Sequence, residues 1–574
     1  MTETKQPADA EAPETAPGTP AGAEARDTAA NTVRREPAAA AEAPEAPPPA
    51  VAPPTEQSGL EALTADLHAR RAKALAMGGP EKIERQHEKG KLSARERLDL
   101  LFDAGTFVEF GLLATGQSMK GESYDPDKTP ADGVVTGHGK VDGREVYAAI
   151  YDFTVMAGSM GMIGEQKVAR LRDLALRNRC PIVWLLDSAG ARIQDATGSM
   201  FAGTGYLFWD QVNMSGVIPQ VSAMVGPCAA GTAYIPGLSD FVPMVKDTSS
   251  MSLGGARLVK AATGEDVTDH EMGGSQVHCY ESGVGDLEVE DDAACIAAVK
   301  EFLSFLPSNN LEQAPIKPTD DPPDRLLEGI EKIVPANMRQ AYDMRKLIRK
   351  IADDNHVFEI KPTWAKNLIT AFVRLGGRSV GVVANQPLHK AGALDNDSAD
   401  KAARFIRMCD AFNVPLLFLQ DVPGFIVGKE VEKQGIIRHG AKMLYAVSEA
   451  TVPKITVVVR KAYGAGYFVM CGKGYYPDLI VAWPTAEISV MGPEGAVNII
   501  FNKQVEAAED PEAAKAMFVD MIRQQINPYI AANWAMIDDV IDPAETRKVI
   551  IQGLEIASRK KVERPWRKHG NIPV

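Results

Sequence analysis

The chain lacks the sequence features that define several common classes of protein. Its 574 residues contain no apolar run of the ~18 residues that a membrane-spanning helix needs. The six cysteines form no CxxC pair and have no regular spacing, which argues against a structural zinc site and a disulfide framework. Most of them lie in apolar runs, as buried reduced thiols do. We therefore expect a cytoplasmic protein with no membrane attachment and no bound metal.

Basic charge is also scarce. The formal net charge is −14, and the chain has no general basic field of the kind that binds nucleic acid. Residues 1–58 carry much of the acidic excess, with 10 acidic and 4 basic residues. They contain 11 prolines and no aromatic residue, so they cannot bury enough apolar surface to offset the entropy lost on ordering. We expect residues 1–58 to form a disordered Ala/Pro/Glu-rich tail.

Several catalytic motifs are missing as well. The sequence has no P-loop GxxxxGK[ST], no GxGxxG after a first strand, no HExxH and no GxSxG. An enzyme of this sequence would therefore use neither a nucleotide of its own nor a side-chain nucleophile. Catalysis by backbone dipoles remains open.

What the chain does contain is a repeat. CPIVWLLDSAGARI and then IPQVSAMVGPCAAGTAYIP occur in the first half, and VPLLFLQDVPGFIV and then VPKITVVVRKAYGAGYFVM occur in the second. The intervals Pro181 to Pro219 and Pro415 to Pro453 are both 38 residues long. Each copy has an apolar strand that ends in an acidic residue, a helical stretch and a second apolar strand. This pattern predicts two similar domains.

Strands and helices alternate through most of the chain. GVVTGHGKV and REVYAAIYDF, joined by the turn signal VDG, predict two strands. Helix 165–177 and strand 182–186 follow, and helix 395–412 and strand 416–419 repeat the plan in the second half. The alternation predicts an α/β fold with a mostly parallel sheet.

A polar, proline-rich segment divides the chain. We interpret residues 313–325 as a linker between an N-terminal domain at 59–312 and a C-terminal domain at 326–574. The N-terminal domain begins with helical spacing from Leu60 to Leu101. Within it, EKIERQHEKGKLSARERLDLLFD has a predicted N-cap, Ser93, with Glu96 at the third helical position. Periodicity alone favours a solvated helical arm for this basic stretch.

The turns that follow the second strand of each copy are candidate binding sites. Ala230-Gly231 in the first half has Ala465-Gly466 as its mate in the second. Small residues allow a ligand carbonyl to approach the backbone, where N–H groups at a strand-to-helix corner can hold an oxyanion. The alternative is that these residues only pack a helix against a sheet. The matched position of the two turns favours a functional role.

Other polar residues are weaker candidates. Asp187 and Asp421 close the first strand of each copy and could act as general bases, although an Asp before glycine more often caps a turn. Gly158-Ser159 precedes a helix whose N-terminus would suit a phosphate. Three isolated histidines lack metal-ligand spacing, and we interpret them as structural: His278, His389 and His439.

From about Leu60 to Val574 the chain closely resembles the carboxyltransferase (β) subunits of biotin-dependent acyl-CoA carboxylases. The most specific stretches are EKIERQHEKGKLSARERLDLLFD, GPCAAGTAY, DVPGFIVGKEVEKQGIIRHGAK, ATVPKITVVVRKAYGAGYFVM and AWPTAEISVMGPEGAVNIIF. The resemblance implies a duplicated crotonase-like ββα superhelix. It also implies a hexamer in which the N-terminal half binds acyl-CoA and the C-terminal half of a neighbouring subunit binds carboxybiotin.

The resemblance also assigns roles by position. Ala230 and Gly231 would hold a thioester enolate, and Ala465 and Gly466 the ureido oxygen of biotin, whose own nitrogen would take the α-proton. If biotin takes the α-proton, neither Asp187 nor Asp421 is needed as a general base. The chain has no biotinyl-lysine motif of the AMKM type and no ATP-binding region. A separate biotinylated α subunit, with biotin carboxylase and carrier domains, is therefore implied.

The acyl group stays open at this point. The family's usual N-terminal turn is Ala-Gly-Gly, whereas this chain has Ala229-Ala230-Gly231. Phe468 occupies the position that influences acyl size, LVKAATGEDVTDHEMGGSQVHCYESGV is methylcrotonyl-like and DNDSADKAARFIRMCDAFNVP is propionyl-like. Two other functions also remain: a transcarboxylase or biotin-dependent decarboxylase subunit of the same family, and a non-catalytic scaffold for the biotinylated subunit.

Overall fold

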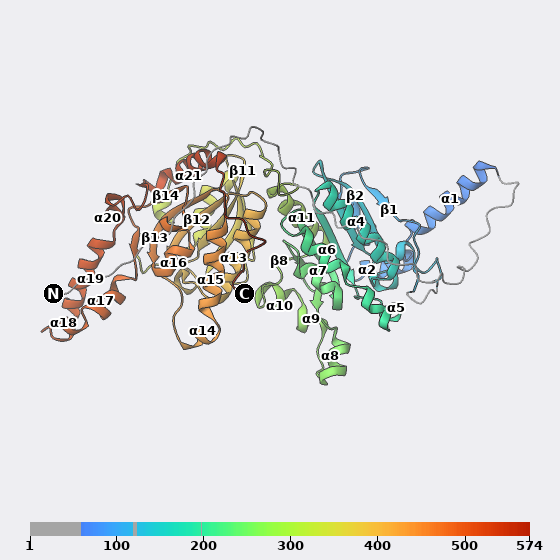
Figure 1. Cartoon of the computed structure of the whole chain (residues 1–574), viewed down its shortest axis with the longest axis horizontal. Helices are drawn as coiled ribbons and strands as arrows, with labels where there is room; N and C mark the ends of the chain where they lie inside the picture. The colour runs from blue at the N-terminus through green and yellow to red at the C-terminus, as the bar shows by residue number, and fades with distance from the viewer. Residues whose placement is uncertain (1–58, 119–122, 197) are drawn as a thin grey trace, which may run out of the picture. The chain divides into compact units, whose positions relative to one another are not determined.

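The computed structural model of the chain describes residues 59–118, 123–196 and 198–574. The tail predicted at residues 1–58 lies outside the described residues. Two eight-stranded sheets dominate the fold (Figure 1). No helix within the described ranges is long and apolar enough to cross a bilayer.

The first sheet contains the strands of the N-terminal half in the order β1-β2-β3-β4-β5-β6-β8, with β7 beside β5. The strands β1, β2 and β3 pair antiparallel, and all later pairs are parallel. The bounds are β1 (Val108–Phe110), β2 (Val134–Val141), β3 (Arg144–Tyr151), β4 (Ile182–Ser188), β5 (Gln220–Ala229), β6 (Pro243–Val245), β7 (Ser250–Ser252) and β8 (Leu287–Val289).

The second sheet repeats this topology with the order β9-β10-β11-β12-β13-β14-β16, and β15 lies beside β13. Again the first three strands are antiparallel and the others parallel. The bounds are β9 (Val357–Ile360), β10 (Leu368–Leu375), β11 (Arg378–Asn385), β12 (Leu416–Val422), β13 (Lys454–Tyr463), β14 (Leu479–Ala482), β15 (Glu487–Ser489) and β16 (Asp539–Val540).

The two halves are equivalent residue by residue over their central part. The strands β2, β3, β4 and β5 begin and end 234 residues (416 − 182 for β4) before β10, β11, β12 and β13. Even the irregularities match, because the register shifts between Leu186 and Ser188 in one sheet and between Gln420 and Val422 in the other. The two similar α/β domains expected from the repeat are confirmed.

Helices cover both faces of each sheet. In the first half α4 (Met162–Asn178) and α6 (Tyr206–Met214) share a core with one face, and α11 (Asp292–Phe305) packs on the other. In the second half α13 (Asn396–Ala411) and α15 (Ile436–Glu449) pack on one face, and α12 (Met344–Ile351) and α21 (Thr546–Ile556) share a core with the other.

The halves share a hydrophobic core. Phe302 and Phe305 of α11 pack against Phe358 and Phe372 of the second sheet, either directly or through Phe241. Burying each phenylalanine side chain contributes about 1.5–3 kcal/mol. The described residues from 59 to 574 accordingly belong to one compact unit. The segment predicted as a linker lies on the second half, where Arg374 donates to the Pro315 carbonyl at 3.1 Å and Lys317 N–H to the Gly377 carbonyl at 2.9 Å.

The chain enters the first half through α1 (Leu60–Leu75), α2 (Pro80–His87) and α3 (Ala94–Leu101). The predicted cap is confirmed, because Ser93 and Glu96 form a reciprocal capping box. The prediction of a solvated arm is wrong for the last part of this stretch. Lys91 and Arg97 are buried, since both reach a carboxylate inside the first sheet.

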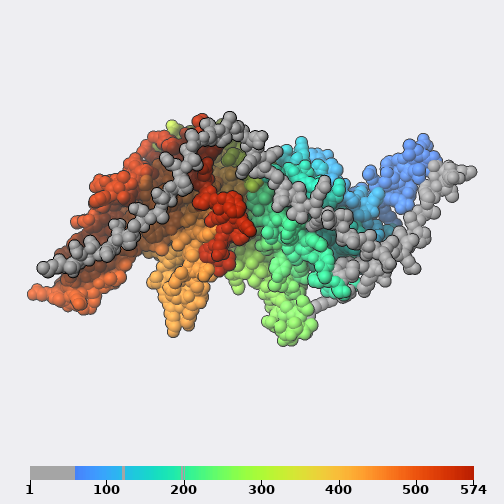
Figure 2. Space-filling view, viewed as in Figure 1, coloured from blue at the N-terminus to red at the C-terminus, as the bar shows by residue number. Residues whose placement is uncertain are grey.

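The remaining helices are short or lie outside these layers. Figure 2 shows that α8 (green) and α14 (orange) project from the surface. The bounds are α5 (Ile193–Ala196), α7 (Tyr234–Gly237), α8 (Ala256–Thr263), α9 (Asp269–Gly273), α10 (Ser275–Tyr280), α14 (Lys429–Lys433), α16 (Gly464–Val469), α17 (Pro493–Ile500), α18 (Asn502–Glu506), α19 (Pro511–Ile526) and α20 (Pro528–Asn533).

Candidate active site

The first candidate turn connects β5 to the 3₁₀ helix η4 (Ala230–Ala233). Ala230 is exposed and has a φ of 57°, a left-handed conformation that favours glycine. Ala230 and Gly231 are the first two residues of η4, so their N–H groups have no acceptor inside the helix. A side chain added at Gly231 would meet only the Phe208 ring, at 3.9 Å. The turn therefore offers two backbone donors next to open space.

The second candidate turn connects β13 to α16 and begins at Gly464, whose φ is 56°. The matching bounds of β5 and β13 pair Ala230 with Gly464 and Gly231 with Ala465. Pairing Ala230-Gly231 with Ala465-Gly466 is therefore wrong by one residue. The left-handed position that defines the corner is Gly464 in this half, and the exposed Ala465 follows it. Gly466 is buried, and a Cβ there would lie 2.7 Å from Val422.

Each half has another left-handed turn, and the sequence singled out only Gly158 of the first one and nothing of the second. Ala157 and Gly158 lie in η2 (Met156–Gly158) with φ values of 55° and 60°, and Ala391 and Gly392 lie in η7 (Lys390–Gly392) with 53° and 79°. The signal was present, because Ala-Gly recurs at the same 234-residue separation (391 − 157) as the other repeats. In each half, an alanine N–H lies at a second left-handed corner.

The two turns of the first half meet at the carboxyl end of β4. The Met160 N–H donates to the Gly190 carbonyl at 2.9 Å, which ties the chain after η2 to the loop after β4. A Cβ on Gly190 would lie 2.6 Å from the Ala229 carbonyl, so this loop also touches the strand that leads into η4. Glycine is required at Gly190, whose φ is 95°. The carboxyl ends of β4 and β5 therefore bring both corners to one edge of the sheet.

The backbone N–H groups of Gly158 and Ser159, the residues that the sequence suggested for a phosphate, are already hydrogen-bonded within the chain. Their N–H groups donate to Val155 and Met156 carbonyls at 2.9 and 3.1 Å. One N–H of the first turn of α4 is already used, because the Gly164 N–H donates to the Asp132 carboxylate at 2.7 Å. Gly158 serves close packing instead: a Cβ there would lie 2.1 Å from the Asp187 carbonyl.

Asp187 and Asp421 are buried and ion-paired, which excludes both as general bases. The Asp187 carboxylate, 1% exposed, accepts from Lys91 at 2.7 Å and from Arg97 at 2.9 Å. Asp421, 0% exposed, accepts from Arg460 at 2.8 Å. A base needs a free lone pair directed at its substrate. These carboxylates are committed to cations inside the sheets.

Aromatic side chains surround the second turn. Phe468 is 48% exposed and packs between Tyr467 and Tyr475, with ring centroids 5.8 and 6.3 Å away. The residue before the turn, Tyr463, donates a short hydrogen bond to Glu487. Burial and this hydrogen bond raise the Tyr463 pKa well above its ordinary value, so the phenol stays protonated. Tyr463 is therefore a fixed support for the turn.

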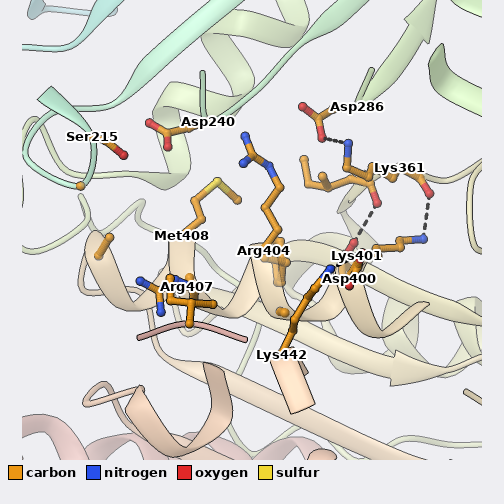
Figure 3. Close-up of a pocket in the computed structure, with 17 residues that line it drawn as sticks. Ser215, Asp240, Asp286, Lys361, Asp400, Lys401, Arg404, Arg407, Met408 and Lys442 are labelled. Carbon is orange, nitrogen blue, oxygen red and sulfur yellow. Dashed lines mark hydrogen bonds and ion pairs between the residues drawn. The ribbon is translucent and has the colours of Figure 1, made fainter. Parts of the chain in front are cut away.

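A pocket of about 420 Å³ lies elsewhere, between the two halves of the chain (Figure 3). Arg404 of α13 extends toward Asp240 of the first half, and Asp286 pairs with Lys361 at 2.7 Å. The pocket contains none of the residues of the turns. Within the described ranges, no group of three His, Cys, Asp or Glu side chains could hold a metal ion.

The duplicated sheets, each with small-residue corners at the carboxyl ends of its central strands, define a pair of crotonase-like domains. The chain belongs to the carboxyl transferase domain family, which matches residues 85–572. It is 46% identical over 511 residues to the propionyl-CoA carboxylase carboxyltransferase subunit of Haloferax mediterranei, covering 89% of this chain and 98% of that protein. It is equally 46% identical to the methylmalonyl-CoA decarboxylase subunit alpha of Veillonella parvula, covering 88% and 98%.

A solved structure gives the same result. The chain superimposes on transcarboxylase 12S with a TM-score of 0.85 and 46% identity, covering 90% of this chain and 99% of that one. That structure is described as a hexamer assembly with methylmalonyl-coenzyme A bound. The predicted family, the crotonase-like fold and the carboxyltransferase class of enzyme are confirmed.

Proposed function

We propose that the chain transfers a carboxyl group between carboxybiotin and the α-carbon, or the vinylogous γ-carbon, of a short-chain or branched acyl-CoA. The observation that carries this proposal is the matched pair of strand-to-helix corners, one in each half. Both present N–H groups that have no acceptor inside the following helix. Two anion-holding corners suit a reaction in which two carbonyl oxygens gain negative charge.

The corner at Ala230 and Gly231 holds the thioester oxygen as the enolate forms. Its donors are backbone groups that need no reorganisation, and each contributes about 3–4 kcal/mol in such sites. The Ala157 N–H, at the neighbouring corner, is the best placed further donor. No ionisable side chain of the corner takes the proton, because Asp187 is committed to Lys91 and Arg97.

The corner at Gly464, Ala465 and Gly466 fits the ureido oxygen of biotin. Ala465 is exposed beside N–H groups at the start of α16, which can donate to a carbonyl oxygen as it gains negative charge. When bound, biotin supplies the carboxyl group and the base for the α-proton. This chain orients that group and stabilises charge on its oxygen. The family supports a biotinylated α subunit as the source of the cofactor and of biotin carboxylase, since a similar protein is named as the carboxyltransferase subunit of propionyl-CoA carboxylase.

Exposed apolar side chains beside both corners support a homo-hexamer with sites between subunits. In the first half α6 borders Gly231 and leaves Trp209 64% exposed. In the second half the Val490 carbonyl lies against Gly464, and the Val490 and Ile499 side chains are 76% and 70% exposed. Figure 1 shows α17–α20 outside the layers of the second sheet. Apolar patches of this kind mark protein interfaces.

A reversed direction is the second candidate function. The identity to a methylmalonyl-CoA decarboxylase subunit equals the identity to a propionyl-CoA carboxylase subunit. The same two corners would serve transfer from a carboxylated acyl-CoA to biotin, because the enolate is common to both directions. The partner decides the direction: an ATP-dependent biotin carboxylase subunit favours carboxylation.

Reconstitution tests the function. We expect the chain with its α subunit to fix labelled bicarbonate onto at least one of acetyl-, propionyl-, butyryl- and methylcrotonyl-CoA when ATP is present. Light scattering of the chain alone should give the mass of a hexamer. Failure with all four thioesters, together with failure to carboxylate free biotin from methylmalonyl-CoA, would reject both directions and leave a scaffold role.

We expect Phe468→Ala to shift the preference toward longer or branched acyl groups. The ring stands half-exposed two residues beyond the second corner, and removing it opens space near the biotin side of the site. The ratio of kcat/KM for methylcrotonyl-CoA over propionyl-CoA should rise about tenfold, because one or two methylenes are worth 10–200-fold in a pocket. Tyr475→Ala, which removes only a neighbouring ring, is the matched control. An unchanged ratio would show that Phe468 does not line the acyl site.

A further inference from the structure

The two buried aspartates recur at the one irregular point of each central strand pair. The register of β4 on β5 shifts around Asp187, and that of β12 on β13 shifts around Asp421. Both strands are buried on both faces, where a carboxylate is expensive unless it is paired. Because a buried carboxylate is costly, its presence at both equivalent positions, Asp187 and Asp421, suggests that it has a role in the site.

In the first half Asp187 lies between the two corners of the site. Its carbonyl packs on Gly158, where a Cβ would come within 2.1 Å, and two residues later the Ala189 N–H donates to the Ala157 carbonyl at 3.0 Å. Its carboxylate packs on Gly226 of β5, where a Cβ would come within 2.0 Å. Gly226 lies four residues before Ala230. Asp187 thus separates the η2 corner from the strand that carries the η4 corner.

The second half has the same arrangement. The Asp421 carbonyl packs on Gly392, where a Cβ would come within 2.7 Å. Its carboxylate accepts from the N–H of Lys461 at 3.3 Å, three residues before Gly464. The backbone and the side chain of each aspartate therefore contact the two segments whose relative position defines a corner.

The cations that neutralise the two carboxylates come from different places. In the second half Arg460, on β13, supplies the guanidinium and also donates to the carbonyls of Pro335, Asn337 and Gln340. The equivalent position in the first half is Gly226, where no side chain fits. Lys91 and Arg97 from the entry segment fill this role instead.

The entry segment is fixed by further bonds. Arg97 donates to Asp292 at 2.7 Å as well as to Asp187, and the Leu92 N–H also donates to Asp292 at 3.0 Å. Burial lowers the Arg97 pKa, but the two carboxylates outweigh it and leave the pKa raised. The basic stretch EKIERQHEKGKLSARERL thus delivers a permanent cation to the first sheet.

We propose that Asp187 with Arg97 and Asp421 with Arg460 are positioning residues, one pair for each corner. Arg97 acts on the acyl-CoA corner through Asp187, and Arg460 acts on the biotin corner through Asp421. Neither touches substrate. This inference rests on the proposed function, because it assigns the two pairs to the two substrates of that reaction.

The test is the transfer between free biotin and the carboxylated CoA ester of the acyl group that reconstitution identifies, with the full-length chain. We expect Arg97→Met to lower kcat about 100-fold while the KM for free biotin stays within twofold, since small displacements at a reacting centre cost this much. Arg460→Met should raise the KM for free biotin about tenfold and leave the KM for the CoA ester unchanged. Arg97→Lys and Arg460→Lys, which keep the charge, should recover part of each loss.

One control lies on the same helix as Arg97, and the other lies on α12, which packs on the second sheet. Arg95→Met removes the Arg95–Glu109 pair on α3, and Arg345→Met removes the Arg345–Glu359 pair on α12, and neither pair includes the aspartates. Both variants should keep the kinetic constants of the unmodified protein within twofold. Equal effects of the control and test variants would overturn the proposal.

A double variant separates position from stability. The double variant Asp421→Asn with Arg460→Met removes both charges of the ion pair, so no unpaired carboxylate stays buried. It should therefore fold even where Arg460→Met alone does not. If the KM for free biotin remains raised in the folded double variant, Asp421 positions the corner. If that KM returns to normal, the pair serves stability alone and the proposal fails. Absence of transfer by the unmodified chain would instead reject the proposed function.

Discussion

Replacing Gly231 by valine should lower kcat for carboxyl transfer about 10²–10³-fold, which is the effect of losing one oxyanion donor. The N–H group at this position remains, but the new side chain fills the space that a thioester oxygen must enter. The fold should survive, because a Cβ at Gly231 meets only the Phe208 ring at 3.9 Å. Steady-state kinetics with propionyl-CoA and the reconstituted α subunit measure the loss.

Gly237→Val is the matched control for this experiment. Gly237 lies at the end of α7, six residues after Gly231, and a Cβ there meets no atom within 4 Å. This variant should retain full activity. Gly466→Val is a poor probe of the other corner, since Val422 lies 2.7 Å from its Cβ position, and Ala465→Val serves better. Full activity of a hexameric Gly231→Val protein would remove the first corner from the mechanism and favour a scaffold.

Much of the central fold could be predicted because the duplication kept its spacing. The interval between prolines placed strands at 182–186 and 416–419, and the structure extends them to Ser188 and Val422. The extensions contain Asp187 and Asp421, which propensity counts as strand breakers. Their burial is decided by distant cations, and no local pattern carries that information.

The sequence could not show which residues of the two turns are equivalent, because that depends on backbone geometry. A left-handed φ singles out Ala230 and Gly464 as equivalent, whereas matching Ala-Gly by letter selected Ala465-Gly466. Similarly, helical spacing made Arg97 resemble a solvated residue, yet it is 1% exposed. Its partners Asp187 and Asp292 are 90 and 195 residues away in sequence. Contacts over such separations are set by the topology, which the sequence reveals only through its repeat.

The same duplication places two lysines inside the protein. Lys401 of α13 is 2% exposed and donates to the carbonyls of Lys361 and Leu368 at 2.8 and 2.7 Å. Lys167 of α4, its equivalent in the first half, donates to the carbonyls of Ala131 and Val134. Each lysine holds the segment that enters the second strand of its sheet. Lys361 and Leu368 are themselves buried, so their carbonyls lose a donor inside the protein when Lys401 is removed.

Lys401→Met should therefore lower the free energy of unfolding by about 3 kcal/mol, because each buried carbonyl left without a donor costs about 1–3 kcal/mol. The methionine side chain keeps nearly the same volume, so no large cavity adds to this cost. Urea denaturation at constant protein concentration measures the difference. Lys366→Met, which alters an exposed lysine, should change stability by less than about 0.5 kcal/mol.

The cost of Lys401→Met should also grow as the pH rises. Burial lowers the pKa of Lys401 to about 7, while the unfolded chain keeps a value near 10.5. Below pH 7 both states hold the proton, so the cost of burying the charge is complete. Above pH 7 the folded state releases the proton first, and the unmodified protein gains stability that the methionine variant cannot gain. Burial lowers the pKa of Lys167 only to about 8, so the penalty of Lys167→Met should begin to grow about one pH unit later. A stability difference that is flat between about pH 6.5 and about pH 9 would mean that the carbonyls hold both ammonium groups charged throughout.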